Sequence, residues 1–204
     1  MLRIWGRDNS NNVRKVLWIA EEIGLHYEHI PLGGAFGGLD DPAFREMNPN
    51  GLVPCMDDDG FVLWESNAIV RYLAAKHSRF WPQDPAARAV GDKWMDWMTS
   101  TFAGGFRDGF FGIIRTPPEK RDQTAIRESL GRTAFNLRIV EDELQRQPYL
   151  SGADIGIGDF AFGGFAYCWF SLPAERPEFP ALADWYGRVS ARPAYRKAVI
   201  TQMT

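Results

Sequence analysis

Two adjacent residues, Glu65 and Ser66, have the side chains that an α-amino acid head group requires. They follow a short apolar run, Phe61 to Trp64, and precede a helical pattern, so we expect them at a strand-to-helix junction. The Ser66 hydroxyl and the free N–H groups of the following helix suit a carboxylate, while Glu65 can pair with an ammonium. The alternative is an ordinary helix start, with Ser66 as N-cap and Glu65 as an acid that stabilises the helix dipole.

Pro54 opens another short apolar run, Val53 to Met56. Because proline cannot donate a ladder hydrogen bond, we expect it at an edge or at the start of a strand. If the Val53–Pro54 bond is cis, Val53 presents its N–H and C=O outward, where a short peptide can pair with them as an added strand. Proline alone does not require this isomer, since few X–Pro bonds are cis in folded proteins.

A polar loop, Arg7 to Asn12, leads from the first apolar run into the first helical pattern. It places the Ser10 hydroxyl at a helix N-terminus and at the carboxyl end of a strand, the edge where open α/β sheets bind ligands. A bound thiol would be favoured there as thiolate, by the helix dipole and by a hydroxyl that donates to sulfur. Lowering a thiol pKa from about 8.5 to about 6.5 requires roughly 2.7 kcal/mol, which these two effects can supply. The alternative is that the loop only caps the helix.

The composition excludes several function classes. The chain has 204 residues, 45% of them hydrophobic, and a net charge of −3, which does not favour nucleic-acid binding. Its two cysteines, Cys55 and Cys168, form no CxxC pair and its three histidines have no ligand spacing, so we expect no metal site. The polar start and the lack of any long apolar run predict no secretory signal and no membrane span. We therefore expect a soluble, cytoplasmic protein.

The secondary-structure pattern of the elements that must position these residues changes near Ser78. Before it, strand and helix patterns alternate in the order β-α-β-α-β-β-α, which is the order of the thioredoxin fold. After the connector of residues 78–84, only helical patterns follow. Strands are expected at Leu2–Trp5, Tyr27–Pro31, Val53–Met56 and Phe61–Trp64, and helices at 13–23, from Asp41-Pro42, from Ser66, at 85–114, 118–145, 156–170 and 180–190, and after Pro193. We predict an α/β thioredoxin-like domain over residues 1–78 and an all-α domain over residues 85–204.

The order of these motifs across the whole chain resembles the cytosolic glutathione transferases of bacteria. The matching residues are Asn48-Pro49-Asn50-Gly51-Leu52-Val53-Pro54, Glu65-Ser66 with Ala68-Ile69, Trp5 through Val13, Lys15-Val16-Leu17, Glu21 through Leu25, and Tyr149-Leu150-Ser151-Gly152 with Asp159.

The resemblance implies that glutathione is the co-substrate. It implies a cis Pro54, main-chain pairing of Val53 with the cysteinyl part, and Glu65 and Ser66 at the γ-glutamyl end. Ser10 falls where theta- and delta-like members place the serine that hydrogen-bonds the sulfur. Asn12 falls where a related bacterial class, active on disulfides and peroxides, places an asparagine.

Two positions depart from the family pattern. Many members have a basic residue in the loop around residues 36–41 for the glycyl carboxylate, and this chain has none there. Asn50, or Arg107 or Arg115 of the helical domain, are the candidate substitutes. The second departure is Gly156, which stands where a helix-capping serine or threonine is expected, although glycine is a tolerable cap.

The aromatic residues of the helical half are candidates for the electrophile site. Phe106, Phe110 and Trp169 are candidates for an apolar pocket, if part of their helices faces a cleft above Ser10. The same helical spacing also fits core positions.

The sequence thus predicts a glutathione transferase that attacks a small electrophile, and the family resemblance implies a homodimer. Two alternatives stay open: a glutathione-dependent disulfide or peroxide reductase, and a non-catalytic binding or scaffold module.

Overall fold

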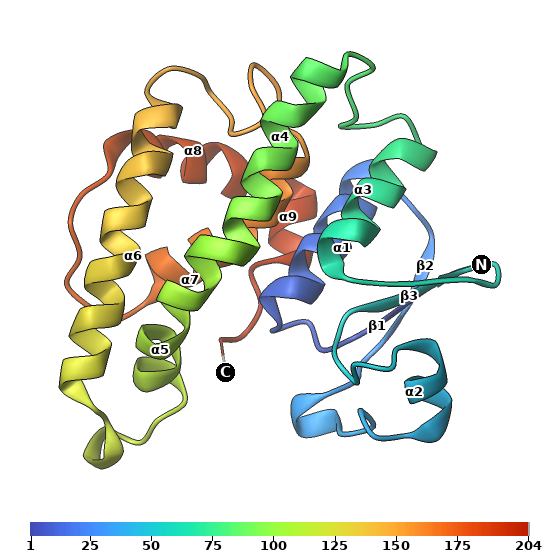
Figure 1. Cartoon of the computed structure of the whole chain (residues 1–204), viewed down its shortest axis with the longest axis horizontal. Helices are drawn as coiled ribbons and strands as arrows, with labels where there is room; N and C mark the ends of the chain where they lie inside the picture. The colour runs from blue at the N-terminus through green and yellow to red at the C-terminus, as the bar shows by residue number, and fades with distance from the viewer. Residues whose placement is uncertain (204) are drawn as a thin grey trace. The chain divides into compact units, whose positions relative to one another are not determined.

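The computed structural model describes residues 1–203, which form two compact units (Figure 1). The first contains residues 1–81 together with residues 192–202, and the second is built from residues 82–191. The sequence-based limits of 1–78 and 85–204 assigned the last helix to the helical domain, whereas here it packs in the first unit. No helix within residues 1–203 is long and apolar enough to cross a membrane.

The first unit contains a four-stranded mixed sheet in the order β2-β1-β3-β4. β1 (Leu2–Trp5) is parallel to β2 (Tyr27–Ile30), whereas β3 (Cys55–Asp58) is antiparallel to both β1 and β4 (Phe61–Trp64). The parallel pair requires a crossover, which α1 (Asn11–Ile23) provides. This topology confirms the predicted thioredoxin-like order.

The strand register brings the predicted site residues to one edge of the sheet. Trp5 at the end of β1 pairs with Cys55 at the start of β3, and Cys55 pairs with Trp64 at the end of β4. The chain leaves β1 toward α1 and leaves β4 toward α3 (Ser66–Lys76). Both helices therefore begin at the edge where β3 starts, directly after Pro54.

Local signals set most helix limits in this unit. Gly24 ends α1 in the left-handed region at φ 82°, and its N–H donates to the Ala20 carbonyl at 3.1 Å. α2 (Pro42–Met47) begins after Asp41, whose carboxylate accepts a hydrogen bond from the Ala43 N–H at 2.8 Å. The sequence predicted both limits, a helix over 13–23 and another from Asp41-Pro42. A short 3₁₀ helix, η1 (Gly34–Phe36), lies in the loop before α2.

The hairpin between β3 and β4 is tighter than the sequence suggested. Only Asp59 and Gly60 form the turn, both at positive φ (52° and 93°), and β3 continues through Asp58. The sequence analysis left residues 57–60 outside the two predicted strands, but Asp57 and Asp58 belong to β3, where both carboxylates have partners. The Asp57 carboxylate pairs with Arg3, and the Asp58 carboxylate accepts from Tyr72 and Lys76.

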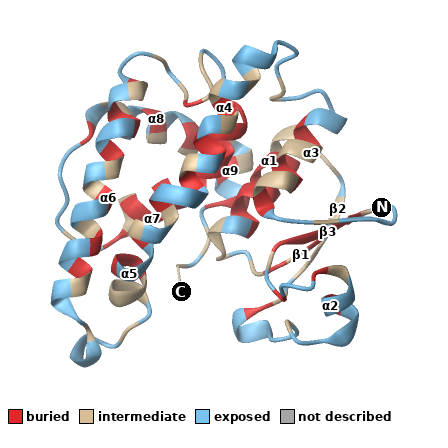
Figure 2. Ribbon diagram, viewed as in Figure 1, coloured by how far each residue is buried: buried red, intermediate tan, exposed pale blue. Residues whose placement is uncertain are grey.

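The centre of the first unit is α1, whose residues 13–20 are all buried (Figure 2). The short helix α9 (Pro193–Ala198) packs against α1, with the Tyr195 ring edge-on to Trp18 at 4.8 Å. The Arg192 guanidinium reinforces this packing by binding both oxygens of Glu22 at 2.6 Å. These contacts place the C-terminal helix in the first unit.

The second unit is helical, as predicted, with two interruptions. Its five α-helices are α4 (Pro85–Trp97), α5 (Ala103–Ile114), α6 (Gln123–Leu144), α7 (Ile157–Ser171) and α8 (Pro180–Ser190). A π-helical turn, η2 (Met98–Phe102), separates α4 from α5, where one continuous helix was predicted. The segment predicted to be helical from Pro118 begins with a 3₁₀ turn, η3 (Pro118–Lys120). α6 starts only after Asp122, whose carboxylate accepts from the Thr124 and Ala125 N–H groups.

A buried carboxylate holds the start of α7. Asp159 accepts hydrogen bonds from the N–H groups of Leu150, Ser151 and Gly156 and from the indole of Trp185, at 2.8–3.2 Å. Gly156 has no side chain to cap this helix, but the Ser151 hydroxyl accepts from the Gly158 N–H at 3.1 Å. A residue from the preceding loop thus takes the capping role that the sequence appeared to lack. Burial raises the pKa of Asp159, although its four donors act in the opposite direction.

We predict that Asp159→Ala lowers the free energy of unfolding by at least about 3 kcal/mol, because four buried donors lose their acceptor. Urea unfolding followed by circular dichroism measures this. Asp154→Ala is the matched control, since Asp154 is exposed in the same loop and should change stability by less than about 0.5 kcal/mol. Equal losses in the two variants would contradict the role assigned to Asp159.

Candidate functional site

The N-termini of α1 and α3 lie together at the sheet edge. The Ser66 hydroxyl donates a hydrogen bond to the Asn12 side-chain carbonyl at 3.3 Å, and Ser66 is buried. In the described chain, neither helix has an acidic residue in its first turn to neutralise its N–H groups. Two positive helix ends therefore converge at one point, which favours an anionic ligand.

Glu65, and not Ser66, is the N-cap residue of α3. The sequence expectation that Ser66 caps the helix was wrong, because Ser66 is the first helical residue and its hydroxyl bonds to Asn12. Glu65 has a φ of 73°, which is rare for a residue with a side chain and costs about 1–3 kcal/mol. Its side chain is exposed. Such backbone strain is concentrated at ligand sites, which supports a binding role for this turn.

A buried lysine forms the second link between α1 and α3. The Lys15 ammonium donates to the Asn67 side-chain carbonyl at 3.0 Å, and Lys15 is only 2% exposed. Burial lowers the pKa of Lys15 to about 8, while the Glu65 carboxylate opposes this shift and Arg71 adds to it. The sequence analysis gave Lys15 no role, and a lysine in an otherwise buried helix segment was the available signal.

The backbone of Val53 is a candidate ligand-binding element. The Val53–Pro54 bond is cis, as the sequence resemblance implied, and in residues 1–203 the Val53 N–H and C=O have no hydrogen-bond partner. Gly6 lies next to Val53 at a position where a larger residue would not fit. A Cβ atom on Gly6 would lie 2.4 Å from Val13 and 3.1 Å from the Val53 Cβ. The β1–α1 loop can therefore pass directly alongside the unpaired backbone of Val53.

The loop before Val53 is held by Asn48, which the sequence analysis did not single out. Asn48 is buried, its amide donates to the Leu52 carbonyl at 2.7 Å, and its side-chain oxygen accepts from the Asn50 N–H at 3.1 Å. The Asn50 amide also donates to Asn48, at 3.2 Å, so this predicted ligand residue is bonded within its own loop. The turn-forming sequence Asn-Pro-Asn-Gly was the signal for this arrangement.

Ser10 is the N-cap residue of α1, but its hydroxyl does not cap the helix. Its backbone is fixed at both ends, since the Ser10 N–H donates to the Arg7 carbonyl and the Ser10 carbonyl accepts from the Arg14 N–H. The hydroxyl is half-buried at the start of α1, three residues before the buried segment of that helix begins. It is therefore available to a ligand at the helix N-terminus.

The two cysteines are buried free thiols. Burial raises the pKa of Cys55 to about 11, so this thiol stays protonated at neutral pH although it follows Pro54 directly. Among residues 1–203 there is no group of three His, Cys, Asp or Glu side chains placed to hold a metal ion.

The aromatic candidates lie inside the second unit. Phe106, Phe110 and Trp169 are exposed by 2%, 6% and 2%. The Phe106 ring is tilted against Phe110 at 5.6 Å and stacked on Phe102 at 5.8 Å. This packing fits the core alternative, and their role as an electrophile pocket stays a prediction.

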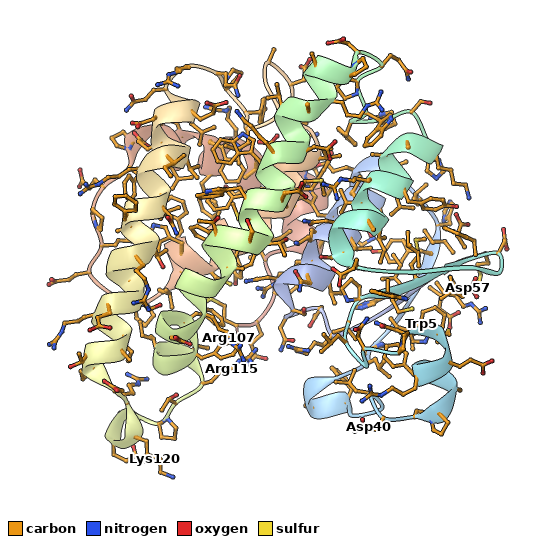
Figure 3. All side chains as sticks on the ribbon, in the orientation of Figure 1. Trp5, Asp40, Asp57, Arg107, Arg115 and Lys120 are labelled. Carbon is orange, nitrogen blue, oxygen red and sulfur yellow. The ribbon has the colours of Figure 1, made fainter. Side chains whose placement is uncertain are left out.

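The two arginines considered for the glycyl carboxylate also belong to the second unit. Figure 3 labels Arg107 on α5 and Arg115 directly after it. Both guanidinium groups lie over the Phe111 ring, at 5.3 Å and 4.2 Å from its centre.

Comparisons with known proteins agree over the whole chain. The family models for the glutathione S-transferase N-terminal and C-terminal domains match residues 9–76 and 107–193. The chain is 45% identical to glutathione S-transferase GstB of Escherichia coli K12 over 204 residues, 98% of each chain.

Solved structures give the same result. The theta class glutathione S-transferase of Xanthomonas axonopodis pv. citri, with glutathione bound, has 54% identity and a TM-score of 0.97 over 100% of this chain and 99% of that one. Glutathione transferase F7 of Populus trichocarpa has 25% identity and a TM-score of 0.87 over 97% of each chain.

The buried amine of Lys15 generates a pH prediction. Its pKa is about 8 in the folded chain against 10.5 in the unfolded chain, so between these values the unfolded chain holds more protons. Stability must therefore rise with pH across this window, by a total on the order of 3 kcal/mol. In Lys15→Met this rise disappears, which urea unfolding at pH 7, 8, 9 and 10 measures.

The matched control for this prediction is Lys197→Met. Lys197 is an exposed lysine of the same unit, paired with Glu21, and its removal should leave the rise in place. Parallel stability profiles for wild type and Lys15→Met would show that the buried amine is not the cause.

Proposed function

Because the chain belongs to the glutathione S-transferase family, we propose that the sheet edge of its first unit binds glutathione and activates the thiol toward an electrophile. The observation that carries the proposal is the meeting of two helix N-termini, joined by the Ser66–Asn12 hydrogen bond, beside the unpaired backbone of Val53.

In this proposal the tripeptide is bound by groups that carry the complementary charges. The Glu65 carboxylate pairs with the γ-glutamyl ammonium, while the Ser66 turn and the first N–H groups of α3 receive the γ-glutamyl carboxylate. The Val53 backbone pairs with the cysteinyl residue as an added strand. Asn12 holds the Ser66 hydroxyl in place from α1.

The cysteinyl sulfur then lies at the start of α1. The Ser10 hydroxyl donates to the sulfur, and the N-terminus of α1 favours the negative charge, so the thiol proton leaves to water. The thiolate attacks an electrophilic carbon, a C–S bond forms, and the leaving group departs with its electron pair. Activation of the nucleophile and proximity supply most of the catalysis. Phe106, Phe110 and Trp169 stay the predicted apolar surface for the electrophile, and a cytoplasmic location stays a prediction.

We predict that glutathione bound to the wild type has a thiol pKa well below that of free glutathione, and that Ser10→Ala raises it by about 1–2 units. A charge-assisted hydrogen bond contributes about 1.5–3 kcal/mol, which corresponds to that shift. Thiolate absorbance of the complex, titrated against pH, measures it. Ser100→Ala is the control, because Ser100 is an exposed serine of the second unit.

Other outcomes of this titration favour the alternative functions. A low pKa that persists in Ser10→Ala would give the role to Asn12 or to backbone donors, and would favour the disulfide or peroxide reductase. Wild-type protein that binds no glutathione would overturn both enzymatic proposals and leave a scaffold.

We also propose that the chain forms a homodimer, as glutathione S-transferases generally do. The supporting feature is the face of α6 that carries Phe135 and Ile139, which are 66% and 45% exposed and one helical turn apart. A cavity of about 600 Å³ lies beside Phe135, between this helix and α5. Exposed apolar side chains next to a hollow are typical of a protein interface, and a second copy carries the same face.

We predict that Phe135→Asp shifts the protein from dimer to monomer, because a charge would replace an apolar contact. Size-exclusion chromatography with light scattering measures the mass. Phe36→Asp is the matched control, since Phe36 is 60% exposed on η1 in the first unit and should leave the dimer intact. A monomeric wild type, or a dimeric Phe135→Asp, would contradict the proposed interface.

A further inference from the structure

The order of elements along the sheet edge fixes where the glycyl end of glutathione must lie. In the proposed function the γ-glutamyl group sits at α3, which follows β4, and the cysteinyl group sits at Val53, which precedes β3. The sheet order is β2-β1-β3-β4, so an extended tripeptide continues toward the loop that follows β2. One residue spans roughly 3.5 Å, less than the spacing of about 4.8 Å between neighbouring strands, so the glycyl carboxylate is directed toward β1 and must be met by a side chain that reaches across from the loop after β1.

Arg7 lies across the loop that follows β2. A Cβ atom on Gly34 would be 3.0 Å from the Arg7 Cδ and 3.4 Å from its Nε, and one on Gly33 would be 3.5 Å from Nη1. Both glycines have positive φ, 80° and 59°, so backbone conformation and space together favour glycine at these two positions. The guanidinium is thereby held against the loop in a half-buried position.

Leu39 lies on the same side of this loop. A Cβ atom on Gly33 would lie 3.3 Å from the Leu39 Cδ2 and 3.5 Å from the Arg7 Nη1. Both side chains therefore lie against the same point of the loop. Leu39 belongs to residues 36–41, the segment in which the sequence departs from its family by having no basic residue. A cation from the β1–α1 loop thus lies beside the segment that has none of its own.

The Arg7 guanidinium has no hydrogen-bond or ion-pair partner in residues 1–203. The acidic residues of the neighbouring loop are engaged, since Asp40 pairs with Arg45 and Asp41 caps α2. Figure 3 labels Asp40 in this loop. The Arg45 guanidinium donates hydrogen bonds to the Asp40 carboxylate and to the Pro49 carbonyl. The positive charge of Arg7, by contrast, has no carboxylate bound to it within the part of the chain that the structure describes.

We infer that Arg7 binds the glycyl carboxylate of glutathione, an inference that rests on the proposed function. The planar guanidinium can donate two parallel hydrogen bonds to a carboxylate, and its packing against Gly33 and Gly34 holds it in place before the ligand arrives. The missing basic residue of segment 36–41 is in this way replaced from a different loop, and Arg107 and Arg115 are not required.

The test compares glutathione with its glycyl amide, which has nearly the same shape but no negative charge at this end. Calorimetric titration of the wild type should give at least about tenfold weaker binding of the amide. In Arg7→Gln the affinity for glutathione should fall by a similar factor while the affinity for the amide hardly changes, so the two ligands bind alike. Arg7→Lys should keep part of the preference, since it retains a point charge.

Lys76→Gln is the control. Lys76 pairs with Asp58 at the far end of β3, so its loss removes a positive charge from the same unit without touching the proposed site. It should discriminate between the two ligands as the wild type does, which separates a local role of Arg7 from an effect of net charge.

The remaining outcomes separate this inference from the function on which it rests. If Arg7→Gln weakens both ligands equally, Arg7 supports the loop only, and the inference fails. It also fails if the wild type binds glutathione and its amide with equal affinity, or if Arg7→Gln still discriminates between them. If the wild type binds neither ligand, the proposed function itself is wrong.

Discussion

The joining of α1 and α3 at their N-termini is the constraint on which the site depends. Two helices that start at the same sheet edge bring two positive ends together, an arrangement that is unfavourable without a compensating anion. The Ser66–Asn12 and Lys15–Asn67 hydrogen bonds hold the helices in this arrangement. The strand register brings both helix starts to this edge, because Trp5 at the end of β1 and Trp64 at the end of β4 both pair with Cys55. The fold itself therefore supplies the electrostatic setting of the proposed site.

The loops around this edge are shaped by close approaches. Gly6 lets the β1–α1 loop pass between Val13 and Val53, and Gly33 and Gly34 let Arg7 lie flat on the loop after β2. Larger residues at these positions would push the loops away from the unpaired backbone of Val53. The glycines thus bring a hydroxyl, a guanidinium and an open backbone to one edge without a long insertion.

The sequence predicted the elements that depend on local signals. Gly24, Asp41 and the proline at the start of α8 mark helix limits, and the short apolar runs indicated all four strands, although β3 lies at Cys55–Asp58 and not at Val53–Met56. Long-range effects were not predictable. The packing of α9 on α1 depends on Trp18 and Tyr195, far apart in sequence, and the π turn after α4 has no clear local signal. In the site, Ser10 and the cis Val53–Pro54 bond were expected. Lys15 was missed because its partner Asn67 lies in another segment. Asn48 was missed although its partners, Leu52 and Asn50, lie in the same turn-forming loop.

The turn from Glu65 to Asn67 shows that this edge is not optimised for stability alone. Glu65 adopts a strained backbone conformation, and Lys15 is buried with a neutral amide as its hydrogen-bond partner. Each feature opposes folding by an amount on the order of 1–3 kcal/mol, and a glycine or an apolar side chain would remove it. Both unfavourable features meet at the residues that flank Ser66. A cost concentrated at one turn is what a pre-organised ligand site requires.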